Sequence, residues 1–230
     1  MGMTPGVRHV AHAIADEVIC LDKSEAAIDM LAEALPATAR KRETIIRDDW
    51  SNMPKVIDGK VELIMGDGVF ANLLNHAGQI EVLTAVYETL ATEGAFVSRC
   101  LIAPDKFDLS EALAPNLIRR FRTGEISEGE FGHGMRVWGC TEECYDANNF
   151  LLDNPKVYQR FDAMLASGNI TVEERGILQR YFFGGTHFYP TQTYWERALT
   201  EVGFDFNATW LKGKFYNEYL PIYQCRKMDR

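Results

Sequence analysis

Glycines and carboxylates near the beginning of the chain have the types and the spacing of a nucleoside-binding site. Gly2, Thr4 and Gly6 fall in a Gly-Pro turn that runs directly into a helical pattern. Acids then end the next apolar runs of the chain, at Asp22, Asp48-Asp49 and Asp67-Gly68. Open α/β sheets hold a nucleoside in this way, because an acid at a strand end accepts hydrogen bonds from ribose hydroxyls. The series therefore predicts nucleoside binding.

Each member of the series also has a simpler interpretation. Gly-Pro turns occur in many proteins, and an aspartate at a strand end often caps the following helix. Asp48-Asp49 would also suit a solvated turn, and Trp50 would suit the core as well as the face of a purine. The hypothesis therefore depends on the order of the glycine turn and the three acidic strand ends.

The elements that must position these residues alternate along the first part of the chain. Apolar periodicity predicts helices over 7–15, 25–35 and 77–90, and strands over 18–21, 44–46, 61–65 and 95–102. Ser24 is the expected N-cap of the second helix. Such alternation predicts an α/β fold that is Rossmann-like, with a mostly parallel sheet and helices on both faces.

The alternation stops at Pro104 and resumes near residue 191. Between them the patterns predict helices over 109–121, 155–165 and 172–183, a loop over 123–149 and no strand. A helix over 193–201 and strands over 204–211 and 219–225 follow, and the two strands suit a C-terminal antiparallel hairpin. We therefore expect one domain built from 1–103 and 191–230, and a helical insertion over 104–190 that caps the substrate.

Charge, hydropathy and cysteine spacing argue against several classes of partner. The 230 residues carry a net charge of −9 at a pI of about 5.1, which makes nucleic acid an unlikely partner. No apolar run has the length of a membrane span, and the beginning of the chain lacks the pattern of a signal peptide, so no membrane contact is expected. The five cysteines are scattered, and the Cys140/Cys144 pair has no second pair, which argues against a metal. These features predict a reduced, cytoplasmic protein.

This order of elements resembles the class I S-adenosylmethionine-dependent methyltransferases, with the first strand of that fold missing. The likeness covers residues 2–102 and 191–226. The segments that carry it are Gly2-Met3-Thr4-Pro5-Gly6, Asp22, Asp48-Asp49-Trp50 and Gly66-Asp67-Gly68. The resemblance implies S-adenosyl-L-methionine as cofactor and a small molecule as substrate, with a homodimer as an open possibility.

The resemblance also implies roles for these residues. Gly2, Thr4 and Gly6 would let the backbone approach the methionine part and the ribose. Asp22 would bind the ribose hydroxyls and Lys23 would flank the adenine. Asp48 or Asp49 would accept the adenine amino hydrogen, and Trp50 would pack on the ring. Asp67 and Gly68 would face the methyl group and the substrate.

An oxygen or nitrogen acceptor benefits from a general base, and histidine suits neutral pH. The candidates are His187 and His76, with His133 as a third; each is also compatible with an ordinary loop or core position. Two further groups of residues each have two interpretations. The aromatic group suits either the core or an apolar substrate pocket, and the arginine group suits either a solvated helix face or the binding of a carboxylate or phosphate. These groups are the aromatic residues Tyr181, Phe182, Phe183, Phe188, Tyr189, Tyr194 and Trp195, and the arginines Arg119, Arg120 and Arg122.

Two other functions stay open. A glycine turn followed by Asp22 also fits the ribose of NAD(P) in an oxidoreductase, although the turn is not Gly-x-Gly-x-x-Gly. A relative without catalytic activity, which binds only the cofactor or a partner, would fit the missing first strand.

Overall fold

A computed structural model describes the chain except residues 104–112, 140, 182–183, 214–216, 218 and 229–230. Its first part runs from the N-terminus to the end of β4. The elements are α1 (Pro5–Ile14), β1 (Val18–Leu21), α2 (Glu25–Leu31), η1 (Ala32–Ala34), α3 (Ala37–Arg40), β2 (Glu43–Ile46), η2 (Trp50–Asn52), α4 (Met53–Val56), β3 (Val61–Asp67), η3 (Val69–Asn72), α5 (His76–Thr89) and β4 (Leu90–Arg99).

Local signals in the sequence set several of these boundaries. Pro5 lies in the first turn of α1, where its missing N–H costs nothing. The Ser24 hydroxyl caps α2 by accepting from the Ala27 N–H at 3.2 Å, as predicted. At the other end of the chain, α11 (Gln192–Val202) ends at Gly203, whose φ of 104° is left-handed.

The sheet is mixed, so the expectation of a mostly parallel sheet was wrong. β1 and β2 form a parallel pair, and a second sheet has the order β3-β4-β9-β8. In it β3 and β4 are parallel, whereas β9 (Ile222–Lys227) is antiparallel to both β4 and β8 (Phe204–Thr209). β9 lies between β4 and β8, and this placement makes two of the three pairings in the second sheet antiparallel. The two closing strands do pair as predicted.

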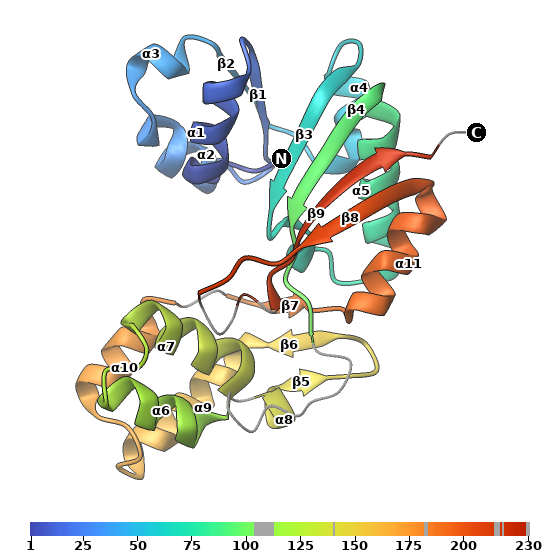
Figure 1. The fold of residues 1–230 in the computed structure, drawn as a ribbon. Helices are drawn as coiled ribbons and strands as arrows, with labels where there is room; N and C mark the ends of the chain where they lie inside the picture. The colour runs from blue at the N-terminus through green and yellow to red at the C-terminus, as the bar shows by residue number, and fades with distance from the viewer. Residues whose placement is uncertain (104–112, 140, 182–183, 214–216, 218, 229–230) are drawn as a thin grey trace.

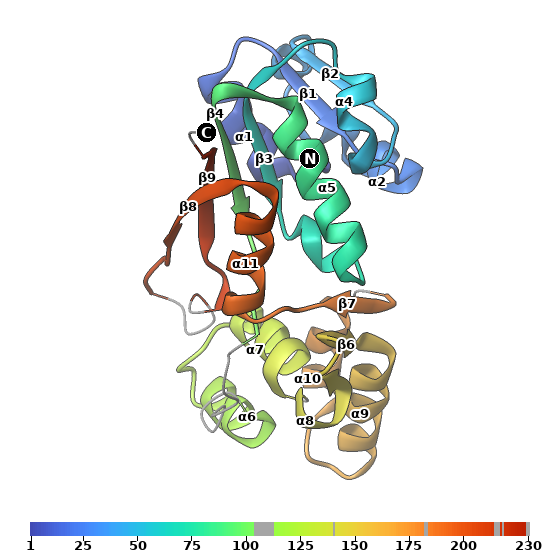
Figure 2. The same cartoon turned by 90° about the vertical axis from the view of Figure 1, so that its right-hand side faces the viewer.

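Helices α5 and α11 cover one face of the four-stranded sheet (Figures 1 and 2). Their buried side chains pack on inward residues of the strands in one core cluster that includes Leu83, Val86, Phe96, Leu199 and Tyr223. Helix α1 contacts β1 and β3. The core therefore holds the carboxyl ends of β1, β3 and β4 at one edge of the domain.

The segment between β4 and α11 has its own core cluster and lies below the sheet in Figure 1. Its elements are α6 (Ala114–Arg122), α7 (Glu128–Gly134), the π-helical turn η4 (Met135–Gly139), α8 (Thr141–Cys144), β5 (Tyr145–Asp146), β6 (Leu151–Asp153), α9 (Asn154–Ala166), α10 (Val172–Gln179) and β7 (Thr186–Phe188). The predicted helices near 155–165 and 172–183 are present as α9 and α10. The predicted helix over 109–121 corresponds to α6, and its residues 109–112 lie outside the described part.

Two expectations for this segment were wrong. The predicted loop over 123–149 contains α7 and η4, and β5, β6 and β7 form a small antiparallel sheet. Strands of two or three residues are too short to show an alternating pattern. Glycine has a low helix propensity, so the glycines of α7 favoured the prediction of a loop. The helix nevertheless forms, and it begins with a capping box between Ser127 and Glu130. No helix among the described residues is both long and apolar enough to cross a lipid bilayer.

Candidate functional site

The glycine turn lies against the acid that follows β1. Gly2 has a φ of 79°, and its N–H donates to the Leu21 carbonyl at 2.9 Å. A Cβ at Gly2 would lie 3.7 Å from Oδ2 of Asp22, an ordinary contact distance, so it is the left-handed φ that favours glycine at this position. Thr4 precedes α1 without capping it through its side chain, and a Cβ at Gly6 would meet nothing within 4 Å. The structure therefore places Gly2 against Asp22, whereas Thr4 directly precedes α1 and Gly6 lies in the first turn of that helix.

Asp22 is buried at the end of β1. Its Oδ1 accepts from the Ser24 backbone N–H at 2.9 Å, while Ser24 itself caps α2. The carboxylate thus shapes the turn with one oxygen and keeps the other on the side of Gly2. This geometry fits a carboxylate that accepts from a ligand hydroxyl.

The residues after β2 are tied to β1 and to one another. Lys23 pairs with Asp49 at 2.9 Å, and the Trp50 indole N–H donates to the Leu21 carbonyl at 2.8 Å. Partial burial favours the neutral acid, but hydrogen bonds from Lys23 and Ser51 outweigh it and lower the pKa of Asp49. Asp48 accepts from the Asn52 amide at 2.8 Å. Both acids therefore hold the turn, and Trp50 packs its ring partly against the core.

Asp67 ends β3 and is paired with Arg99 at the end of β4. The Asp67 oxygens accept from the Arg99 Nε and Nη2 at 2.7 and 2.9 Å. Gly68 follows with a left-handed φ of 64°, and its N–H donates to the Arg99 carbonyl at 2.9 Å. A bidentate ion pair of this kind holds both strand ends in a fixed arrangement.

The insertion holds a polar cluster, and only one of its members was a leading sequence candidate. Arg136 is buried; its Nη1 lies 3.2 Å from Oδ1 of the buried Asn154 and 3.5 Å from Nδ1 of His187. Burial and the Arg136 charge lower the pKa of His187 to about 4. Burial, Arg136 and then Arg99 lower the pKa of His133 to about 3. Both imidazoles are therefore neutral at pH 7.

The sequence analysis missed Arg136 and Asn154, because neither lies in a recognised motif. The one signal near Arg136 was the glycine-rich stretch of α7, which leads into the π-helical turn that carries this residue. Such turns are frequent at functional sites. The influence of Arg99 on His133 links this cluster to the Asp67–Arg99 pair across the two parts of the fold.

His76 lies elsewhere, in the first turn of α5. Its Nδ1 is 2.7 Å from the Tyr194 hydroxyl, and its Nε2 is 3.4 Å from Glu201. The side chain is about half exposed, at 47%. The structure therefore does not bring His76 and His187 into one cluster.

The aromatic residues divide between the two core clusters. Trp195 belongs to the sheet domain and Tyr189 to the insertion, and Tyr181 packs on the insertion core. Tyr194 meets Phe188 edge-on and Phe150 at a tilt, at 5.5 and 5.1 Å between ring centroids, where the two parts meet. Phe182 and Phe183 lie outside the described residues.

The three arginines of α6 form ion pairs with glutamates of the insertion. Arg119 and Arg120 pair with Glu125 at 2.6 and 3.7 Å, and Arg122 pairs with Glu174 at 2.7 Å. This arrangement favours the solvated-helix interpretation over anion binding.

Within the described ranges, no three His, Cys, Asp or Glu side chains are grouped as metal ligands. Cys140 is not among those residues. The donor set is instead suited to an organic cofactor with hydroxyl groups, because glycine backbone and a buried carboxylate adjoin at the start of α1. Gly2, Thr4, Gly6 and Asp22 are the residues that could hold it.

No protein-family profile matches the chain, and no curated protein matches it. Solved structures do. A SAM-dependent methyltransferase from Methanosarcina mazei superposes with a TM-score of 0.54 at 11% identity, covering 100% of this chain and 90% of that one. The glycopeptide N-methyltransferase MtfA gives 0.54 at 14% identity, over 98% of this chain and 78% of that one.

CalO1, a methyltransferase in calicheamicin biosynthesis solved in its SAH-bound form, gives a TM-score of 0.52 at 9% identity. That match covers 99% of this chain but 46% of CalO1, so this chain spans about half of that protein's length. Identities at this level are evidence about the fold. The alternating first part, the mixed sheet and these superpositions together show that the chain has the fold of the class I S-adenosylmethionine-dependent methyltransferases.

Proposed function

We propose that the chain is an S-adenosylmethionine-dependent methyltransferase that acts on a small molecule. The observation that carries this proposal is the contact between the Gly2–Gly6 turn and the buried Asp22 at the start of α1. In the proposed site Gly2, Thr4 and Gly6 adjoin the methionine part, and Asp22 accepts from the ribose hydroxyls. Lys23, Asp48, Asp49 and Trp50 form the adenine side of the site.

The bound cofactor supplies a methyl group already activated by its sulfonium. The protein then has to position the acceptor in line and exclude water. Asp67 and Gly68 lie at the strand end that faces this reaction in the proposal, with Arg99 fixing the Asp67 carboxylate. The insertion is the proposed cap over a small substrate, because it follows β4 directly and holds the polar residues Arg136, Asn154 and His187.

His187 is the proposed general base, with His76 as the alternative. The low pKa of His187 keeps its imidazole unprotonated at neutral pH, so it can accept a proton. His76 is available to solvent and bonded to Tyr194. Loss of methyl transfer in His187→Gln, with unchanged cofactor binding, would support His187; loss in His76→Gln alone would support His76.

Thermal unfolding with adenosyl ligands tests the proposal. A ligand at a hundred times its Kd adds about 2.7 kcal/mol to native stability. For a chain of this size that raises Tm by roughly 5 °C or more. We expect this shift with S-adenosylmethionine and S-adenosylhomocysteine. A shift with NAD alone would replace the proposal by the oxidoreductase, and no shift with any ligand would favour the non-catalytic relative.

Asp22→Asn sharpens the test, because asparagine keeps the Oδ1 acceptor for Ser24 and removes the charge. Hydrogen bonds to charged groups contribute about 1.5–3 kcal/mol, so calorimetry should show binding weakened at least about tenfold. Asp29→Asn, at an exposed position of α2, is the matched control and should bind normally. Equal affinities in both variants would remove Asp22 from the site.

A further inference from the structure

The insertion contains one strained residue, Phe150, in the turn between β5 and β6. Its φ of 57° is left-handed, and among the described residues no other non-glycine residue has a positive φ. Asparagine tolerates this conformation, whereas a bulky aromatic residue adopts it rarely. Asn148 and Asn149 directly precede Phe150, so the residue type that suits the conformation is one position away. The surrounding structure must therefore hold Phe150 in place.

The backbone of the turn is fixed on both sides of Phe150. The Phe150 carbonyl accepts from the Tyr189 N–H at 2.7 Å. On the other side, the carboxylate of Asp146 accepts from the backbone N–H and the side-chain amide of Asn149, at 3.3 and 2.7 Å. These bonds set the direction in which the Phe150 ring leaves the turn.

The ring of Phe150 joins the insertion to the sheet domain. Its centroid lies 6.0 Å from that of Phe188 on β7 and 5.1 Å from that of Tyr194 on α11. Phe188 and Tyr194 also meet, at 5.5 Å, so the three rings form one group, here called the junction cluster. Tilted and edge-on aromatic pairs are favourable beyond the area that they bury. The junction cluster therefore holds two residues of the insertion on one residue of the sheet domain.

Tyr194 is anchored on the sheet domain by its polar neighbours. Its hydroxyl lies 2.7 Å from Nδ1 of His76 at the start of α5, and Nε2 of His76 lies 3.4 Å from Glu201 on α11. A hydroxyl both donates and accepts, so its bond to the imidazole is possible in either protonation state of His76. The Arg197 guanidinium lies over the tyrosine ring, 5.7 Å from its centroid. Tyr194 thus gives the insertion a fixed surface to pack on.

The chain passes between the sheet domain and the insertion at two points that adjoin. Ala103, after β4, forms a parallel bridge with Thr191, and its N–H donates to the Pro190 carbonyl at 2.8 Å. The insertion lies below the sheet in Figures 1 and 2. Two adjacent connections alone would let one part rotate on the other, as in a hinge motion. Contacts other than this bridge must therefore fix the angle between the parts.

The junction cluster is the contact best placed to fix that angle. Its member Phe188 lies on β7, and β7 also contacts η3 of the sheet domain. The rings of Trp138 and Tyr219 also meet, at 4.8 Å, but this pair lies next to the bridge, because the Tyr219 carbonyl accepts from the Ile102 N–H at 3.0 Å. A contact beside a hinge restrains rotation less than one that involves a separate element.

We propose that the Phe150 ring, seated on Phe188 and Tyr194, is a latch that fixes the angle of the insertion on the sheet domain, with the Ala103–Thr191 bridge as the hinge. Strain in the Phe150 backbone favours release of the ring, whereas the ring contacts favour closure. A ligand that contacts both parts shifts the balance between these two opposed terms. This proposal does not depend on methyl transfer, because it concerns only how the two parts are held.

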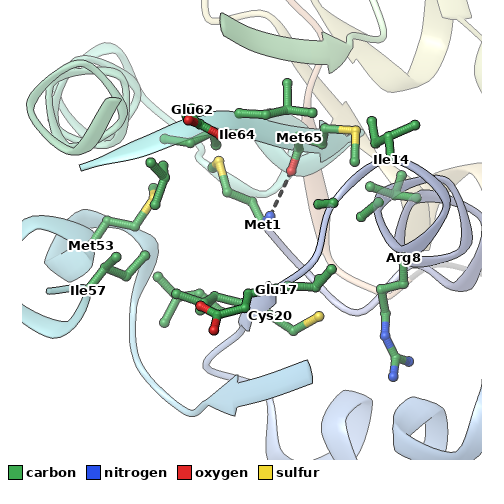
Figure 3. Close-up of a pocket in the computed structure, with 18 of the residues that line it drawn as sticks. Met1, Arg8, Ile14, Glu17, Cys20, Met53, Ile57, Glu62, Ile64 and Met65 are labelled. Atoms are coloured by element: carbon green, nitrogen blue, oxygen red, sulfur yellow. Dashed lines mark hydrogen bonds between the residues drawn. The ribbon is translucent and has the colours of Figure 1, made fainter. Parts of the chain in front are cut away.

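A cavity of about 670 Å³ in the sheet domain is separate from this latch. Figure 3 shows its mixed walls, in which Arg8, Glu17 and Glu62 lie among apolar side chains. The described residues that line it all lie between Met1 and Met65. A ligand confined to this cavity would contact the sheet domain alone, so the latch concerns a different part of the molecule.

The first test measures the distance between the two parts with a pair of nitroxide labels. Glu81→Cys on α5 and Gln159→Cys on α9 are exposed positions, and a Cys140→Ser background leaves the four described cysteines, which are buried. Electron–electron double resonance should give one narrow distance distribution for this labelled chain. Phe150→Gly should broaden it or add a second, longer distance, because glycine suits the left-handed turn but lacks the ring.

Asn149→Gly is the matched control, because it disturbs the same turn and keeps the Phe150 ring. Its distance distribution should stay narrow. Equal broadening in Asn149→Gly and Phe150→Gly would overturn the proposal, since the turn and not the ring would then hold the parts together. An unchanged distribution in Phe150→Gly would also overturn it.

Thermal unfolding tests the strain separately. Phe150→Ala and Phe150→Gly both remove the ring, but only glycine relieves a left-handed backbone. Phe150→Gly should therefore have a Tm roughly 2–4 °C above that of Phe150→Ala. Ala163→Gly, at an exposed position of α9, should show the usual order and lower the Tm. A Tm of Phe150→Gly below that of Phe150→Ala would show that the Phe150 backbone stores no strain, and would overturn the proposal.

Discussion

The carboxylate of Asp67 and the guanidinium of Arg99 form a bidentate pair, at 2.7 and 2.9 Å, that joins the carboxyl ends of β3 and β4. Arg99 also contributes to the low pKa of His133 in the insertion. One arginine thus acts on a residue of the sheet edge and on a residue of the part that covers it. The charge of Arg99 therefore couples the sheet edge to His133 of the insertion, although burial and Arg136 lower the pKa of His133 more.

Arg99→Gln should raise the pKa of His133 from its value of about 3, because a like charge is removed while burial stays. The direction can be measured by following the His133 ring signals in an NMR titration. Arg119→Gln, which removes an arginine paired with Glu125 on the insertion surface, should leave that pKa unchanged. Identical titration curves in the wild-type chain and Arg99→Gln would show that the two residues are not coupled.

Arg8 of α1 should be among the most important polar residues for stability. It is buried and donates to both oxygens of Glu43 on β2, at 2.9 and 2.5 Å. Removing one partner leaves a buried charge, so Arg8→Met should lower the free energy of unfolding by about 3–5 kcal/mol in urea denaturation.

Two further variants separate this effect from a simple loss of packing. Arg8→Met combined with Glu43→Leu should cost less than Arg8→Met alone, because no charge is stranded. Arg47→Met breaks an exposed pair with Glu25 at 2.9 Å and should cost less than about 1 kcal/mol. A double variant as unstable as the single one would contradict the charge argument.

Stability should fall as the pH is lowered from about 6.5 toward 4. The pKa values of His187 and His133, about 4 and about 3, lie below the ordinary 6.5 because of burial and nearby arginines. Between those values the unfolded chain binds protons that the native chain does not, so protonation favours unfolding. Each histidine contributes a slope of up to about 1.4 kcal/mol per pH unit.

Urea unfolding at several pH values measures this slope, and His187→Asn should flatten it. The contribution of Glu43 to the free energy of unfolding changes over a lower range of pH. Burial opposes the charged form, but bonds from Arg8 and Cys20 lower its pKa, so its contribution is lost only as the pH falls below the ordinary 4.5. A constant free energy of unfolding between pH 6.5 and 5 would show that neither histidine is held neutral by the fold.

Gly132 in α7 should not tolerate alanine. A Cβ there would lie 2.1 Å from the ring of Tyr181, and both residues pack in the insertion. Gly132→Ala must displace that ring, and we expect a loss of about 1–3 kcal/mol, typical of overpacking. Gly176→Ala, in α10, meets nothing within 4 Å and should gain about 0.4–1 kcal/mol. Thermal unfolding of the two variants compares them directly, and equal Tm values would contradict the crowding at Gly132.

The sequence by itself determined the elements whose signals are local. The continuous apolar run at Val18–Leu21 is β1 with the predicted bounds, Ser24 caps α2, and Gly203 ends α11. Such features depend on neighbouring residues, and a pattern of hydrophobicity or a cap reports them directly. The same logic located the glycine turn and Asp22, which the structure brings together.

Tertiary structure alone decided the arrangement of those elements. β9 lies between β4 and β8 and makes the sheet mixed, and α7 is a helix although its glycines disfavour one. The cluster of Arg136, Asn154 and His187 forms from segments distant in the chain, and Arg99 acts on His133 across the two parts. Strand order, burial and electrostatic coupling are set by long-range packing, which leaves no periodic signal in the sequence that produces it.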